Sequence, residues 1–411
     1  GETGFSLLAF RNPGDRQVRR EAELRLRGIT LAHPDFGHDV TDVTGNVSLA
    51  GDLVRTDGLT LKWGEGTIEV PAQRVQLSSR DRERVTLAVR DLPLDDAVIA
   101  LLPKFIRRTI DQVNPKGIMD VDAEVLWPGK AGRAVDVNVN LTGRDGEFSY
   151  VGFPYKVEKV SGRLVMEGPD LILAEFKGRH GDTLVEVGLK NIEREGTPWR
   201  QITVRGTNGT IDVDLRNALG PDARALWEVL KPAGGLDVVY VRQHQRKPWR
   251  TDIYRVSTDV LLNDVTVQLG EPVLIQSGKV TVAELLPTDE GTAYQGSASV
   301  GALTTRDMTA TEIKLRFEGG EQSGRLMLQN IEGGFYDGVL SGHISLPSIG
   351  AVKEQPGFEG VVTLTDADAA AVAAANGYDE IAGRLDVTAA FTGEIGADEP
   401  VNCSGALTIR E

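Results

Sequence analysis

The sequence is poor in the residues that most often carry chemistry or cross-links. Its 411 residues include one cysteine, Cys403, and five histidines, and only 6% are aromatic. A single cysteine excludes an intrachain disulfide and a metal site built from several thiolates. In its Asn-Cys-Ser-Gly context, Cys403 is typical of a small strand residue rather than a nucleophile.

Long apolar runs and excess positive charge are also lacking. No stretch of about 18 apolar residues occurs, so no segment is predicted to span a bilayer as a helix. No signal-peptide pattern is visible. The net charge of −15 argues against a basic surface that wraps nucleic acid or coats an anionic membrane. We therefore expect no nucleic-acid partner.

Motifs for catalysis are absent as well. There is no Gly-x-Ser-x-Gly elbow and no phosphate-binding loop that ends in Gly-Lys-Ser/Thr. His33 and His38 flank a Pro-Asp-Phe-Gly turn at a spacing that does not match a helical zinc motif, so a surface turn is favoured over a metal site. We expect no enzyme activity, no catalytic residue, no metal and no cofactor.

An internal repeat is the strongest positive signal. Val43-Thr44-Gly45 and Val160-Ser161-Gly162 are 117 residues apart, and this offset runs without a gap from residue 24 to residue 121. Along it, 18 of 98 positions are identical, against roughly 6 in 100 for unrelated sequences of average composition. A degraded third copy begins near Ser277-Gly278-Lys279. The sequence predicts repeat units over residues 1–128 and 129–250 and an expanded, degenerate unit over 251–411.

Each unit is predicted to be mostly strands with one short helix. Apolar and polar residues alternate in segments such as 46–50, 59–63 and 67–70, which is typical of strands with one apolar face. Helical spacing of apolar residues predicts helices over 94–113, 211–230 and 367–376, with a kink at Pro103 in the first. Successive strands joined by short turns pair antiparallel.

Two polar features allow more than one interpretation. Asp120, Asp237 and Asp386 follow the predicted helix in all three copies. They could be repeated ion or headgroup sites, but a local hydrogen-bonding role at the start of a strand is favoured. The basic run 242–250 could bind lipid headgroups or a partner, although such runs are more often solvated loops.

The order of these segments resembles the AsmA-like group, which includes the TamB and YhdP proteins and is similar to the bridge-like lipid-transfer proteins. The resemblance is carried by the Gly-x-Leu/Val strands, the helix that contains Leu101-Leu102-Pro103, the returning Gly-x-Leu-Asp-Val strand, and the Gly-Gly-Phe-Tyr-Asp-Gly stretch from residue 333. The segments 85–125, 160–187, 313–346 and 361–393 match best.

This resemblance implies a mainly β fold with short amphipathic helices, in which an elongated antiparallel repeat sheet curls into a hydrophobic groove. The groove would shield the acyl chains of phospholipids, or of other lipids, in transit between membranes in the periplasm or cell envelope of a diderm bacterium. The expected lining is Val47, Leu49, Leu59, Leu61, Ile68, Val70, Leu164, Met166, Leu171, Leu173, Phe176, Val185, Val187, Val280 and Val282.

The chain would then be a soluble segment of a larger protein, whose transmembrane anchor and membrane contacts lie outside these residues. Other envelope proteins are possible partners. The alternative is a structural or adhesive β-repeat protein of the envelope, with its apolar faces closed against each other and no lipid cargo.

Overall fold

The computed structural model describes residues 1–10, 19–32, 37–77, 83–102, 104–127, 135–246, 254–269, 271–288, 291–306, 308–320, 324–348, 356–375, 377–378, 381–395 and 401–411. Contacts divide the chain into two compact units. Unit 1 comprises residues 1–180 and 187–190, and unit 2 comprises residues 181–186 and 191–411. The three predicted repeat units, 1–128, 129–250 and 251–411, remain a prediction about sequence duplication.

Unit 1 is an antiparallel sheet interrupted by one pair of helices. Its elements are β1 (Glu2–Phe10), β2 (Arg19–Leu31), β3 (Val40–Ala50), β4 (Leu53–Trp63), β5 (Gly66–Val70), β6 (Gln73–Gln76), β7 (Glu83–Pro93), α1 (Asp96–Leu101), α2 (Lys104–Val113), β8 (Lys116–Trp127), β9 (Asp136–Tyr150), β10 (Phe153–Glu167) and β11 (Asp170–His180). Strand β12 (Thr183–Arg194) contributes residues to both units.

Unit 2 is also an antiparallel sheet, interrupted by one pair of helices and by a further short helix. It contains β13 (Thr197–Thr210), α3 (Val213–Ala218), α4 (Pro221–Leu230), β14 (Ala233–Gln245), β15 (Tyr254–Leu269), β16 (Glu271–Thr288), β17 (Gly291–Thr305), β18 (Met308–Gly320), β19 (Arg325–Phe335), β20 (Gly338–Pro347), β21 (Gly357–Asp368), α5 (Ala369–Ala375), β22 (Arg384–Glu394) and β23 (Asn402–Arg410).

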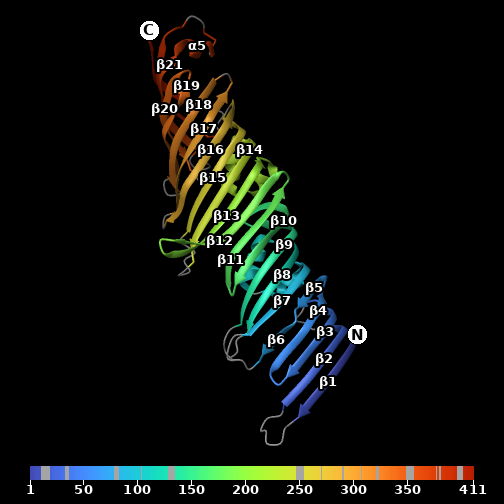
Figure 1. The fold of residues 1–411 in the computed structure, drawn as a ribbon. Coiled ribbons are helices and arrows are strands. Elements are labelled where there is room, and N and C mark those ends of the chain that lie inside the picture. Colours follow the sequence, from blue (N-terminus) through green and yellow to red (C-terminus); the bar gives the residue numbers. More distant parts are fainter. Residues whose placement is uncertain are drawn as a thin grey trace. The chain divides into compact units, whose positions relative to one another are not determined.

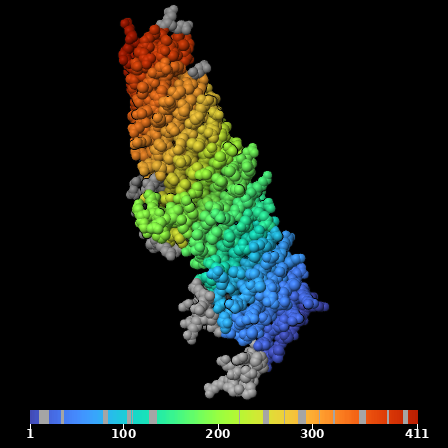
Figure 2. Space-filling model, viewed as in Figure 1, coloured from blue at the N-terminus to red at the C-terminus, as the bar shows by residue number. Residues whose placement is uncertain are grey.

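Neighbours in sequence are neighbours in the sheet. Within each unit the colours of Figures 1 and 2 follow one another in bands, because almost every strand pairs antiparallel with the next strand along the chain. The predicted fold class is confirmed: the protein is mainly β, with antiparallel repeat strands and short helices. The predicted helix over 94–113 is two helices, α1 and α2, and that over 211–230 is α3 and α4.

Helices α1 and α3 each begin with an aspartate cap. The carboxylate of Asp95 accepts the N–H of Val98 at 2.9 Å, and Asp212 accepts the N–H of Leu215 at the same distance. These side chains satisfy backbone donors that a helix leaves without partners at its first turn. The caps stand 117 residues apart, as the sequence repeat requires.

The core is thin for a protein of this size. Among the described residues, no large side chain is less than 2% exposed. The chain exposes 24951 Å², whereas two compact proteins of half its mass would together expose about 19,000 Å². The sheets therefore do not close over their apolar faces as a compact domain does.

Candidate functional site

The candidate site is the apolar face that the sheet presents in each unit. In unit 2 the register lines up Val238, Val260, Val280, Ala298 and Leu315 as direct partners across β14 to β18. Directly paired residues in an antiparallel sheet point to the same side. This row is therefore a continuous apolar stripe across five strands.

Strand β17 shows that this face is the more shielded one. Ala298 and Val300 are half-buried, while Ser297 and Ser299, which point to the other side, are exposed. Alanine and serine have similar size, so side-chain length does not explain the difference. A sheet curled toward its apolar face shields that face in this way.

Unit 1 repeats the arrangement. The register across β7 to β11 lines up five direct partners: Val89, Val121, Leu141, Leu164 and Ala174. All five are buried or half-buried. Each unit therefore has its own apolar stripe perpendicular to its strands.

On β7 and β22, burial of the apolar face is greatest beside the helices. On β22, Leu385 is 4% exposed and packs with Ala369 of α5, whereas Val387 and Phe391 farther along the same face are half-buried. On β7, Val89 is buried beside Val98 of α1, and Leu87 and Val85, farther along the same face, are half-buried. The short helices thus cover one end of the apolar face and leave the rest uncovered by any helix in the described residues.

Most of the predicted lining residues lie on this face. Register and alternation place there Val47, Leu49, Leu59, Leu61, Ile68, Val70, Leu164, Met166, Phe176, Val280 and Val282. Leu171 pairs with Met166 beside a register shift, and Val185 and Val187 share one face of β12, the first buried and the second half-buried.

Leu173 is the exception. It pairs with Val165, whereas Leu164 pairs with Ala174, so Leu173 lies on the face opposite the stripe. The cause is the register shift between Val165 and Met166, because an extra residue in one strand reverses the alternation beyond it. Counting in twos along 171–176 cannot reveal such a bulge.

The recurring aspartates have a structural role. Asp120 accepts the backbone N–H of Asp91 at 2.8 Å, Asp237 that of Asn208 at 2.6 Å, and Asp386 that of Asp366 at 2.8 Å. Asp91, Asn208 and Asp366 have φ values of 55°, 56° and 57°, a strained conformation for residues other than glycine. Each aspartate therefore holds a left-handed residue of the preceding strand in place.

We call each aspartate, together with the left-handed residue that it holds, a bracket. In two of the three copies an arginine also binds the aspartate of the bracket. Arg144 on β9 donates to Asp120 at 2.8 Å and also pairs with Asp91, and Arg410 on β23 pairs with Asp386 at 2.9 Å. Both arginines follow their aspartate by 24 residues. In the middle copy the register puts Asn263 at the equivalent position, and Asn208 replaces the acid, so one charge of each sign is lost together. This spacing was a signal in the sequence that the prediction missed.

The two brackets that include an arginine lower the pKa values of their aspartates. The N–H of Asp91, followed by the Arg144 guanidinium, holds the pKa of Asp120 below its usual range. The N–H of Asp366 and then Arg410 do the same for the pKa of Asp386. These bonds favour the local hydrogen-bonding role over an ion site, since the carboxylates already have cationic and backbone partners.

The histidines also have local partners. His38 is half-buried, its Nε2 lies 2.8 Å from the Asp95 carboxylate, and its ring meets the edge of Trp63. Burial alone would raise the pKa of Asp95, but the N–H of Val98 and the His38 ring outweigh it and lower that pKa. His33 lies outside the described residues. The predicted turn also lies largely outside them, and His38 lies against the cap of α1.

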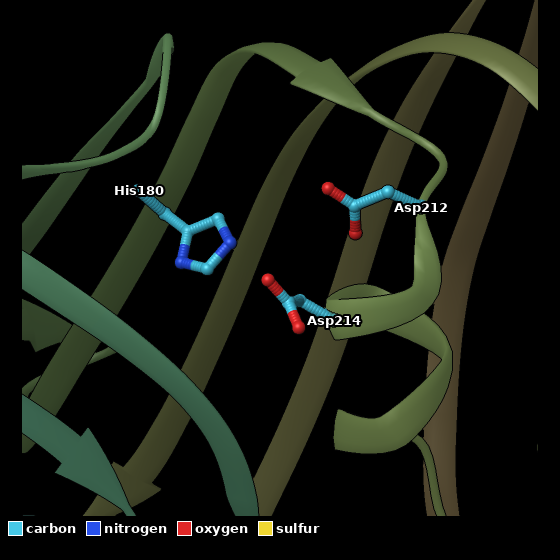
Figure 3. Close-up of side chains that lie close together, drawn as sticks. All are labelled: His180, Asp212 and Asp214. Carbon is cyan, nitrogen blue, oxygen red and sulfur yellow. The ribbon is translucent and has the colours of Figure 1, made fainter.

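Figure 3 shows where Asp212 and Asp214 begin α3. Asp212 is the helix cap and Asp214 lies in the first turn, both roles that the helix dipole favours for acids. His180 belongs to unit 1, where its Nδ1 is 2.7 Å from the carbonyl oxygen of Lys156 and its ring stacks on Tyr155 at 3.9 Å. Within either unit, the described residues contain no group of three or more metal-ligating side chains.

The basic run 242–250 is only in part within the described residues. Residues 242–245 belong to β14 and pair with β13 and β15 instead of forming a loop. Arg242 lies 4.8 Å from the ring centre of Tyr254, a cation–π contact. Burial, with Arg200 and Arg242 nearby, lowers the pKa of His244. Residues 247–250 lie outside the described part of the chain, and Cys403 is an exposed residue of β23.

Fold and site together define a class: antiparallel β-repeat proteins in which one apolar sheet face is left open beyond short helical caps. No helix of the described residues is long and apolar enough to cross a membrane. Comparisons with protein-family models, with curated proteins and with solved structures gave no match for this chain.

Proposed function

We propose that this chain shields the acyl chains of phospholipids, or of similar lipids, along its apolar sheet face. The observation that carries the proposal is the unbroken stripe of directly paired apolar side chains in each unit, half-buried and open beyond the helical caps. An apolar face of this extent in a water-exposed protein marks a surface that is made to be covered.

An acyl chain fits the chemistry of this face. The stripe consists of valine, leucine and alanine and crosses five strands in each unit, and isoleucine and phenylalanine lie beside it on the same face. A lipid tail is long, flexible and apolar. Moving one CH₂ group from water to an apolar surface is favourable by about 0.8 kcal/mol, so sheltering a 16-carbon tail would contribute on the order of 12 kcal/mol. A conduit of this kind acts by solvation alone and uses no catalytic residue.

The wider setting is part of the same proposal. The order of the sequence segments resembles AsmA-like proteins, which supports transport between membranes in a diderm cell envelope, with membrane contacts made by regions beyond these residues. Envelope proteins are the expected protein partners. We propose a carrier and not an enzyme.

Site-specific photo-crosslinking tests the proposal directly. A crosslinker at Leu49, Leu61 or Leu164 should capture lipid in cells, and one at Ser48 or Lys62 should not. Leu173 is the sharpest control, because it is a half-buried leucine like Leu164 but lies on the opposite face. Equal capture at Leu164 and Leu173 would contradict the assignment of the lipid to this face.

The rival function is a structural or adhesive β-repeat protein with closed apolar faces. Organic extraction of the purified protein, followed by mass spectrometry, separates the two. A carrier should yield lipid in stoichiometric amounts, whereas a closed structural protein should yield none. The large exposed area of the chain favours the carrier.

A further inference from the structure

The polar face of unit 2 contains a hollow that the lipid-carrier function does not use. It spans β16 to β19 and has a volume of about 580 Å³, within the common range of ligand sites. Its lining includes Lys279, Ser297, Ser299, Lys314, Arg316 and Glu332.

The hollow follows from the sequence of β17. Ser297 and Ser299 are small, so the face dips at this strand, while longer side chains stand on the strands at either side. The register sets Lys279 and Lys314 directly opposite Ser299, one on each neighbouring strand, and Arg316 opposite Ser297. Strands are about 4.8 Å apart, so the two lysines begin about 10 Å apart and can lean toward each other over the serine.

These three cations lie close together but form no ion pair within the described residues. Acidic residues outnumber basic ones by 60 to 45, and many of the described cations are ion-paired, for example Lys62 with Asp42 and Lys116 with Glu147. In the part of the chain that the structure describes, Lys279, Lys314 and Arg316 have no acidic partner within 4 Å. Three cations thus face one hollow, and none of them is ion-paired with an acidic side chain of the described residues.

The nearby acids do not cancel this charge. Glu332 pairs with Lys314 in the register without forming an ion pair, and Asp259 accepts the hydroxyl of Thr281 at 2.7 Å. Hydroxyl groups on the floor and cations at the walls provide donors from several directions. This is the donor set that an oxyanion with several charges requires.

We propose that this hollow binds a phosphate-bearing anion, with Lys279, Lys314 and Arg316 as its cationic ligands and the serines of β17 as its floor. The site is on the face opposite the apolar stripe and is independent of the lipid cargo. The phosphate can belong to a free phosphorylated compound or to the headgroup of an anionic lipid, and the two sources are separable by experiment.

Titration calorimetry with inorganic pyrophosphate on the full chain tests the first source. We expect saturable binding that Lys314→Gln weakens about tenfold, because a charge-assisted contact is lost. Glu332→Gln should strengthen binding a few-fold, because it removes a neighbouring negative charge. Lys62→Gln is the matched control, an exposed lysine of unit 1 whose loss should change nothing.

Flotation with vesicles tests the second source. Binding to phosphatidylglycerol vesicles but not to phosphatidylcholine vesicles, lost in Lys314→Gln and kept in Lys62→Gln, would assign the phosphate to a headgroup. Binding of pyrophosphate alone would assign it to a free compound. The proposal is overturned when neither ligand binds, or when Lys314→Gln and Lys62→Gln behave alike. Crosslinking at Leu164 reports on the lipid carrier separately, so the two ideas can fail independently.

Discussion

A single aspartate per repeat holds a left-handed residue of the neighbouring strand. Asp120, Asp237 and Asp386 each accept an N–H from a residue with φ near 55°. The recurrence of these aspartates was visible in the sequence, and so was the preference for a local hydrogen-bonding role. The partner residue was not visible, because a β-bulge depends on register between two strands and leaves no pattern in either one.

Removing such a bracket should destabilise the protein measurably. Asp120→Ala leaves the N–H of Asp91 without its acceptor and Arg144 with one carboxylate fewer, so we expect a loss of about 1–2 kcal/mol in the free energy of unfolding. Asp122→Ala is the matched control on the same strand, since it removes an exposed ion pair with Arg90 and should cost less than about 1 kcal/mol. Urea unfolding followed by circular dichroism gives both values. Equal losses would show that the backbone bond is unimportant.

The same brackets predict acid sensitivity. The pKa values of Asp120 and Asp386 are lowered in the folded state, so these groups stabilise the fold at pH values above their unfolded pKa, near 4. That stability is lost as the pH falls below 4 toward the folded pKa values. The urea midpoint should therefore be flat from pH 7 to 5 and fall below pH 4, and the fall should be shallower in Asp120→Ala. A midpoint that rises on acidification would contradict the role of these carboxylates.

At the scale of the element, one glycine precedes each bracket. Gly117, Gly234 and Gly383 have φ values of 142°, 138° and 107°, and a Cβ at Gly117 would lie 2.8 Å from the Cα of Gly146. The Gly-x-x-Asp motif therefore marks a place where two strands approach closely and the chain returns from the helix. The sequence predicted the strand after each helix correctly for this reason. It also predicted a break at Pro103, and α1 ends at Leu101 while α2 begins at Lys104, so only the outer bounds of the helices differ.

Substitution of this glycine should disturb the junction between helix and strand. Gly117→Ala combines an unfavourable φ with a backbone contact that cannot relax, and we expect a cost on the order of 1–3 kcal/mol. Gly188→Ala is the control, because an added Cβ meets nothing within 4 Å there and its φ is not in the positive range. Thermal unfolding of the two variants should separate them clearly. A neutral Gly117→Ala would mean that the strands part at little cost.

At the scale of the whole molecule, the repeat explains why each unit stays open. Each strand pairs with its neighbour in sequence, so burial comes from the strands themselves and from short helices at one end. Period-two alternation predicted strands with one apolar face, and of the ten stripe residues it named Leu164 and Val280, while it put Leu173 on the wrong face. It could not predict how far the helices cover the face, or that contacts divide the chain into two units, because neither property is encoded in the alternation of single strands.

An open face should tolerate a charge that a closed core would not. Val280→Asp lies in the half-buried stripe, and we expect it to cost no more than about 1 kcal/mol while it sharply reduces co-purified lipid. Leu385→Asp lies under α5 at 4% exposure, and burial of its carboxylate should cost several kcal/mol. Lipid extraction and urea unfolding of both variants give the two readouts. A large loss of stability in Val280→Asp would favour the closed structural alternative.

The heat-capacity change of unfolding reports how much apolar surface the whole folded protein leaves exposed. Unfolding exposes apolar surface and raises the heat capacity by about 12–15 cal/mol/K per residue in compact proteins, or about 5–6 kcal/mol/K for a chain of this length. This protein already exposes 24951 Å² when folded, some 6,000 Å² more than two compact proteins would. If little more than half of that excess is apolar, the delipidated protein should show a value about 10–15% lower. The lipid-loaded protein should recover part of the difference, since the apolar face is then covered before unfolding and exposed after it. Differential scanning calorimetry on both forms makes this comparison, and a delipidated value at the compact average would mean that the apolar face is closed in solution.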